Sequence, residues 1–130
     1  MKTLSRESLL KKKELKRVEV ILNEETGEGV WVRQMTAREK NNWEISQHKK
    51  VVTKGTRTGR QVTYDLQLED YRAKLAVQCV CDAKGELLFK PEDVEMLSIN
   101  MSAADLEKIV DVANDLNTIT KEEEEDMVKN

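Results

Sequence analysis

The most apolar part of the chain lies between residues 65 and 97 of an otherwise polar protein. Its apolar residues recur at steps of three and four, the spacing of one helix face, at Leu68, Tyr71, Leu75 and Cys79. A turn at residues 82–85 follows, where Gly85 can take the positive φ that ends a helix. Residues 87–89 read as a short extended segment, and Pro91 suits the first turn of a second helix. We therefore expect the core to be built around this helix pair.

Two further segments have the pattern of helices. Thr36 and Glu39 have the spacing of a capping box, and a helix should follow to about residue 50, with Trp43 on a thin apolar stripe that predicts a peripheral position. Near the C-terminus Ser102 is a candidate N-cap, and Asn117 a candidate stop. Between them the apolar residues keep the i, i+3, i+4, i+7 pattern of a buried helix face: Leu106, Ile109, Val110, Ala113 and Leu116.

Alternation of apolar and polar residues predicts a β-hairpin near the N-terminus. The alternating apolar residues are Val18, Val20, Leu22, Val30 and Val32. Between the two runs, Gly27 and Gly29 supply the positive φ that a hairpin loop needs. If the valines face the core, Ile21 and Trp31 lie on the opposite face. That face is either covered by the helix after Thr36, with Trp43 packing on Trp31, or offered to a partner.

Together these elements predict an α+β fold, an N-terminal β-hairpin followed by a small bundle of three to four helices. The length of 130 residues suits one domain, which we place at residues 17–117. Residues 1–16 are predicted to be partly ordered, with Ser5 capping a short helix or the terminus frayed. Residues 51–62 show no helical period and are predicted to be a mobile loop. Residues 118–130 form an acidic tail or a short helix.

The composition argues against several classes of function. Charged residues make up 36% of the chain, but the net charge is −3, whereas nucleic-acid binding needs a concentrated basic surface. No run approaches the roughly 20 apolar residues of a membrane span, and the N-terminus lacks the apolar region of a signal peptide. We therefore expect a soluble protein with neither a nucleic acid nor a membrane as partner.

No residue pattern supports catalysis, a cofactor or a bound metal. A nucleophile needs a neighbouring base, and the single histidine, His48, lies in a lysine-rich segment. Cys79 and Cys81 are one residue apart on the predicted helix and form neither a CxxC motif nor part of a four-ligand zinc set. We expect both to be buried and reduced, and we predict a protein that is not an enzyme.

Five segments together carry a resemblance to a known family: SRESLL at residues 5–10, VWVRQMTARE at 30–39, YRAKLA at 71–76, VCDAKGELLF at 80–89 and the terminal VKN. They resemble the tail assembly chaperones of long-tailed, siphovirus-type bacteriophages, whose hairpin exit has the similar pattern VRxLTAxE. It covers most of the chain and is least evident at residues 51–62. These segments are structural signatures, not a catalytic code.

The resemblance implies a non-enzymatic protein that binds the tape measure protein and recruits tail tube subunits during tail assembly. It further implies a place in the host cell cytoplasm, absence from the mature virion, and in many members a longer frameshifted form. Apolar patches within a charged surface also favour self-association, so we predict a weak homo-oligomer. Two other classes stay open: a virion structural protein such as a tail-completion or connector subunit, and a small nucleic-acid-associated regulator using the basic residues 49–60.

We place the predicted interaction surface on the hairpin face that carries Ile21 and Trp31, together with the adjoining loop. The alternation leaves Trp31 no place in the valine layer, and a tryptophan buried at an interface commonly contributes about 2 kcal/mol or more. The candidate residues are Ile21, Trp31, Trp43, Lys54, Arg57 and Arg60.

Overall fold

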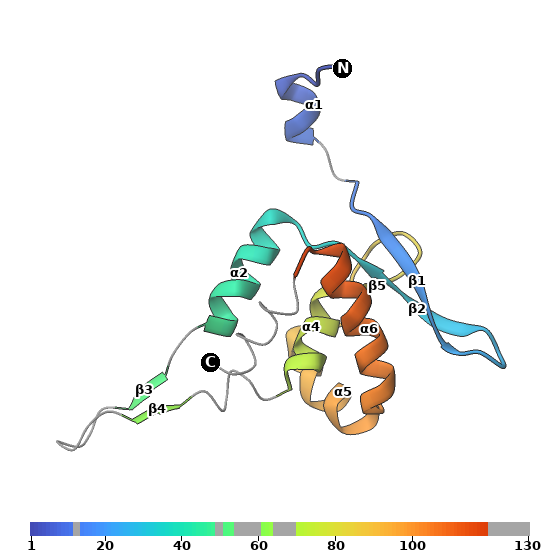
Figure 1. Ribbon diagram of the computed structural model, residues 1–130, viewed down its shortest axis with the longest axis vertical. Coiled ribbons are helices and arrows are strands. Elements are labelled where there is room, and N and C mark those ends of the chain that lie inside the picture. Colours follow the sequence, from blue (N-terminus) through green and yellow to red (C-terminus); the bar gives the residue numbers. More distant parts are fainter. Residues whose placement is uncertain (12–13, 49–50, 54–60, 64–69, 120–130) are drawn as a thin grey trace.

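The computed structural model describes residues 1–11, 14–48, 51–53, 61–63 and 70–119 (Figure 1). In chain order its elements are α1 (Arg6–Lys11), β1 (Arg17–Asn23), β2 (Glu28–Arg33), α2 (Ala37–His48), β3 (Val51–Thr53), β4 (Gln61–Thr63), α4 (Tyr71–Cys79), β5 (Val80–Cys81), the 3-10 turn η1 (Pro91–Asp93), α5 (Val94–Asn100) and α6 (Ala103–Leu116). This is the predicted α+β fold, a hairpin followed by helices.

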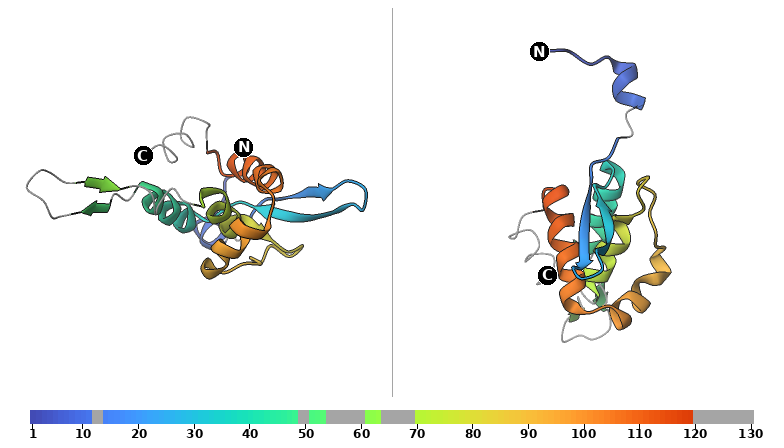
Figure 2. Two further views of the ribbon diagram at one scale, coloured as in Figure 1. Left: turned by 90° about the horizontal axis from the view of Figure 1, so that it is seen from below. Right: turned by 90° about the vertical axis from the view of Figure 1, so that its right-hand side faces the viewer.

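The N-terminal hairpin belongs to an antiparallel sheet of order β1-β2-β5. Val18 lies opposite Val32, and Val20 opposite Val30, so the valines share one face as the alternation predicts. The strand β5 adds a third member that the sequence did not reveal, with Val80 opposite Val32 and Cys81 opposite Trp31. Figure 2 shows the hairpin extending beyond the helices that cover this sheet.

The main core lies between the valine face of the sheet and the helices α4 and α6. Leu75 on α4 and Ile109 on α6 are 0% and 1% exposed, as their helical spacing predicts. Most of the remaining core comes from the same elements: Val20, Val32, Tyr71, Ala76, Cys79, Val80, Leu106, Val110 and Ala113. A second, smaller cluster joins α4 to α5 through Ala73, Val77 and Leu97.

The helix α4 ends earlier than its apolar pattern predicts. The sequence extends the helix through Cys81, whereas the structure ends it at Cys79 and makes Val80 and Cys81 a strand. The cause is tertiary, because both residues pair with β2 and the carbonyl of Val80 accepts the amide of Leu88. Sheet pairing therefore overrides the local helical preference of an apolar run.

The two glycines of the hairpin loop serve different purposes. Gly27 has φ 76°, the left-handed conformation expected of it. Gly29 does not have a positive φ. A Cβ atom at Gly29 would lie 2.1 Å from the carbonyl oxygen of Val20. Gly29 is thus required because the two backbones approach closely, not because of its φ angle.

The helix α2 begins at the predicted capping box. The backbone amide of Thr36 donates to the Glu39 carboxylate at 2.8 Å, and the backbone amide of Glu39 donates to the Thr36 hydroxyl at 3.1 Å. The Glu39 carboxylate also accepts a hydrogen bond from the buried Arg33 guanidinium. The ring of Trp43 is 4% exposed and lies 5.6 Å from the ring of Tyr71. The helix expected to be peripheral is therefore anchored in the core through its one large aromatic residue.

Asn117 connects three parts of the fold at one buried point. Its Oδ1 accepts the backbone amide of Met35 at 2.6 Å, and its Nδ2 donates to the carbonyl of Ala113 at 2.8 Å. The same Nδ2 lies 3.7 Å from the sulfur of Cys79 at the end of α4. One amide side chain therefore links the exit of β2 with the C-terminal ends of α6 and α4.

The C-terminus of α6 is closed by a Schellman motif. The amide of Ile119 donates to the carbonyl of Asn114 at 2.8 Å, and the amide of Thr118 to that of Asp115 at 3.4 Å. Thr118 holds the left-handed position with φ 54°, where glycine is usual. The 5% exposed Ile119 packs against the core, as this motif requires.

Three other segments complete the comparison with the sequence. Ser5 caps α1 through a bond of 3.1 Å from the amide of Ser8, so the short-helix alternative holds. Val51–Thr53 pairs with Gln61–Thr63 as a two-stranded ladder, so both ends of the predicted loop are strands. The predicted mobility of residues 51–62 stays untested. Residues 54–60 and most of the acidic C-terminal segment lie outside the described residues.

Replacing Asn117 with alanine should lower the free energy of unfolding by about 2 kcal/mol, since the buried amide of Met35 is left without a partner. Urea unfolding followed by circular dichroism measures the change. Asn42→Ala removes the same group from an exposed position on α2 and should stay within about 0.5 kcal/mol of wild type. Equal losses for both variants would contradict the role given to Asn117.

Replacing Thr118 with glycine should raise the free energy of unfolding by about 0.5–1 kcal/mol, because glycine adopts the left-handed conformation without steric cost. Thr118→Ala is the matched control. It removes the same hydroxyl but keeps the unfavourable φ, so it should give no gain. A thermal melt in which alanine and glycine stabilise equally would show that the backbone at Thr118 is unstrained.

Candidate protein-interaction face

The sheet has a second face, opposite the valines, which we call the outer face. Glu19 lies opposite Trp31 and Ile21 opposite Gly29, so Ile21 and Trp31 share the outer face, as the alternation predicts. Ile21 is 43% exposed and Trp31 is partly buried. No helix covers Trp31 in the way that the packing alternative required, because Trp43 packs on Tyr71 instead.

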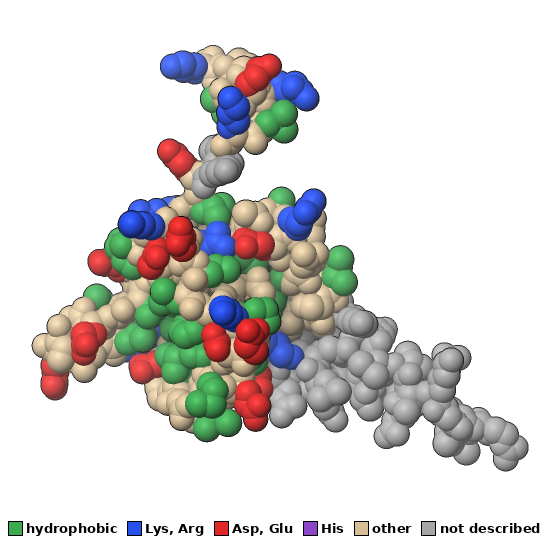
Figure 3. All heavy atoms as spheres, turned by 180° about the vertical axis from the view of Figure 1, so that it is seen from behind, with side chains coloured by type: hydrophobic (Ala, Val, Ile, Leu, Met, Phe, Trp, Pro, Cys, Tyr) green, Lys and Arg blue, Asp and Glu red, His purple; other side chains and the backbone are tan. Residues whose placement is uncertain are grey.

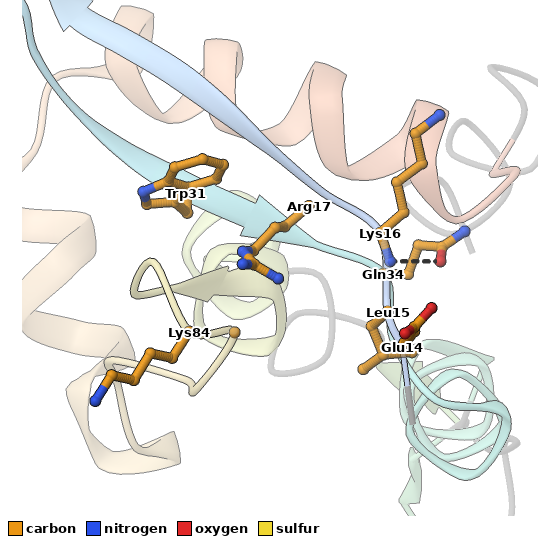
Figure 4. Close-up of a pocket in the computed structure, with 8 residues that line it drawn as sticks. Glu14, Leu15, Lys16, Arg17, Trp31, Gln34 and Lys84 are labelled. Atoms are coloured by element: carbon orange, nitrogen blue, oxygen red, sulfur yellow. Dashed lines mark hydrogen bonds between the residues drawn. The ribbon is translucent and has the colours of Figure 1, made fainter. Parts of the chain in front are cut away.

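The indole of Trp31 is covered by a cation from the neighbouring strand. The Arg17 guanidinium carbon lies 5.6 Å from the ring centroid, within the range of a cation–π interaction. Figure 4 shows this guanidinium between the indole and the loop that carries Lys84. Arg17 is exposed and Trp31 is partly buried, so this amphipathic pair keeps one side toward solvent.

An open hollow of about 790 Å³ lies beside this pair, at the start of β1. It is lined by Glu14, Leu15, Lys16, Arg17, Trp31, Gln34, Lys84 and Gly85. At its rim the amide of Lys16 donates to the side chain of Gln34 at 3.0 Å, drawn as a dashed line in Figure 4. Three of the lining side chains are basic and one is acidic, so the hollow favours a partner with negative charge.

The loop that forms one wall of the hollow is held by Asp82. Its carboxylate accepts the amides of Lys84 at 2.8 Å and Glu86 at 3.0 Å. These backbone bonds, led by that from Glu86, lower the pKa of Asp82. The carboxylate therefore stays charged at neutral pH, and its contribution to the order of the loop is lost only as the pH falls through its lowered pKa.

A smaller hollow of about 170 Å³ lies on the same sheet toward the hairpin tip. Its lining residues are Glu19, Val20, Ile21, Gly27, Gly29, Val30 and Trp31. Trp31 therefore lines both hollows, and the two together make a shallow surface along the hairpin. Such a surface can bind an extended segment that places one apolar residue beside the indole.

The other predicted interaction residues do not join this face. Trp43 belongs to the core and is 4% exposed, so the structure removes it from any surface that a partner reaches. Lys54, Arg57 and Arg60 lie outside the described residues. The sequence missed Arg17 and Lys84. The alternation of residues along the strands could have placed Arg17 on the same face as Trp31. The position of Lys84 depends on the pairing of β5, which the sequence did not reveal.

The described residues offer no group suited to chemistry at this face. No cluster of three or more candidate metal ligands occurs among them. Both cysteines are buried and free; burial raises the pKa of Cys79 to about 12 and also raises that of Cys81. A thiol with such a pKa is a poor nucleophile at neutral pH. No helix within the described residues is long and apolar enough to cross a membrane.

Comparison with solved structures finds a similar fold. No protein-family model matches the sequence, and no curated protein matches it significantly. The structure of the tail assembly chaperone of bacteriophage HK97 superposes with a TM-score of 0.54 at 14% identity. The match covers 88% of this chain and 95% of the HK97 chain. The chain therefore shares its fold, over 88% of its length, with a phage tail assembly chaperone.

Proposed function

We propose that this protein is a tail assembly chaperone of a long-tailed bacteriophage. It binds the tape measure protein and recruits tail tube subunits during assembly in the host cytoplasm, and it is absent from the mature virion. The observation that carries the proposal is the fold shared with the HK97 tail assembly chaperone across 95% of that chain. The sequence segments that resemble the same family, above all the hairpin exit and capping box at residues 30–39, point in the same direction.

The surface chemistry suits a protein that holds an apolar client in solution. Exposed apolar side chains are spread among charged ones, and charged residues make up 36% of the chain. Such a surface binds apolar segments weakly at several points while it remains well solvated. We place the contact with the client on the outer face, where Trp31 lies between two hollows.

Co-expression with the tape measure protein of the same phage tests this function directly. We expect the tape measure protein to be largely insoluble alone and to co-purify in soluble form with this chain. We also expect the chain to be missing from purified virions by mass spectrometry. A stoichiometric copy in the virion would instead assign it to a structural role in the tail, such as a completion or connector subunit.

Replacing Trp31 with alanine tests the position of the contact. Because Trp31 is partly exposed, we expect a loss of at most about 2 kcal/mol in the free energy of unfolding, with much weaker capture of the tape measure protein per folded molecule. Trp43→Ala is the matched control. It removes a buried indole and should cost about 3–5 kcal/mol, while the molecules that remain folded keep their binding.

The opposite pattern would move the contact elsewhere. If Trp31→Ala melts as low as Trp43→Ala and binds normally once folded, the indole is a structural residue. The co-expression experiment would still decide whether the protein acts as a chaperone.

A further inference from the structure

Two apolar surfaces outside the outer face are left uncovered by the residues that the structure describes. The first is on α1, where no residue is buried and Leu9 and Leu10 are 57% and 69% exposed. A helix of six residues is only marginally stable in water by itself. The helix α1 therefore gains most from a surface that covers its two leucines.

The second surface is on α5. Met96 and Ile99 are one helical turn apart, so they lie on the same side of the helix, and they are 61% and 68% exposed. Beside Ile99 lies an open hollow of about 520 Å³, lined by Asp70, Pro91, Glu92, Val94, Glu95, Ser98 and Ile99. Figure 3 shows the face of the molecule where apolar and acidic side chains gather side by side.

The two surfaces carry opposite charge. The hollow beside α5 has three carboxylates, those of Asp70, Glu92 and Glu95, and no lysine or arginine among its lining residues. Residues 1–11 contain three basic residues and one acidic residue. Arg6 precedes Leu9 and Leu10 by three and four positions, so all three lie on one side of α1. A basic helix with two leucines thus matches an acidic hollow beside two apolar side chains.

We propose that α1 of one copy docks on α5 of a second copy. Leu9 and Leu10 cover Met96 and Ile99, and Arg6 faces the carboxylates of the hollow. This contact does not involve Trp31, and it holds or fails independently of the proposed function.

The reach of the chain points to a second copy as the occupant. The chain joins the body at Lys16, whose backbone amide donates to the side-chain oxygen of Gln34. The side-chain nitrogen of Gln34 in turn donates to the carbonyl of Leu116 at the C-terminal end of α6. The helix α5 joins the opposite end of α6, which is 14 residues or about 21 Å away. The five steps from Lys11 to Lys16 span at most about 18 Å. The linker between α1 and the body therefore does not by itself span the length of α6, and Figure 1 shows α1 and α5 at opposite ends of the molecule.

The small size of α1 indicates how the copies are arranged. A single docked helix of six residues is far smaller than a stable interface, which buries about 1,200 Å² or more in total. Reciprocal exchange between two copies uses the contact twice and closes the assembly as a dimer. We therefore expect a weak dimer whose population rises with concentration.

Analytical ultracentrifugation of the full chain, from micromolar to millimolar concentration, tests the contact. The variant Leu9→Asp/Leu10→Asp and the variant Ile99→Asp should each raise the dimer dissociation constant at least about tenfold. Ile45→Asp is the matched control, since Ile45 is an isoleucine of similar exposure, 66% against 68% for Ile99, on a different helix. It should leave the dissociation constant unchanged, and all three variants should keep the wild-type circular dichroism spectrum.

Mixing the two defective variants shows whether the two surfaces meet each other. The α1 variant keeps an intact α5, and the α5 variant keeps an intact α1, so a heterodimer keeps one of the two exchanged contacts intact, whereas a homodimer of either variant keeps neither. An equimolar mixture should therefore dimerise more tightly than either variant alone, but more weakly than wild type. A mixture that associates no more tightly than the separate variants would overturn the proposal. So would a wild-type chain that remains monomeric at millimolar concentration, because both apolar surfaces would then belong to a different partner.

Discussion

One buried amide side chain, that of Asn117, joins three parts of the fold. The exit of β2, the end of α6 and the end of α4 are far apart in sequence, and all three have polar atoms at the same point in the core. A buried backbone amide such as that of Met35 must find an acceptor, since leaving it unpaired costs about 1–3 kcal/mol. Asn117 accepts this amide and donates to the carbonyl of Ala113, so it ties the exit of β2 to the end of α6.

The position of the outer face follows from that constraint. Once the valine face of the sheet is held against α4 and α6, the opposite parity of each strand must point away from the core. Trp31 then lies on the outer side, and Arg17 and the loop held by Asp82 shape the hollow around it. The large aromatic group on this face is therefore a consequence of how the core is built.

The exposed apolar surface of the molecule falls into two parts. The outer face is formed by sheet residues, whereas α1 and α5 offer small helical surfaces of opposite charge. In our two proposals client binding uses the outer face, whereas self-association uses α1 and α5.

The sequence by itself determined the elements and the faces they bury. Local sequence patterns were sufficient for three features: the helical spacing of Leu75 and Ile109, the capping box at Thr36, and the strand alternation that separates Trp31 from the valines. Local signals also located Asn117 as a helix stop, but not its three partners. Tertiary structure alone decided that Val80 and Cys81 leave their helix to pair with β2, that Trp43 turns into the core, and that Lys84 comes to lie beside Trp31. Each of these features depends on contacts between residues distant in sequence. The free energy of those contacts exceeds the local conformational preference of the segment, and the spacing of residues along the chain does not reveal it.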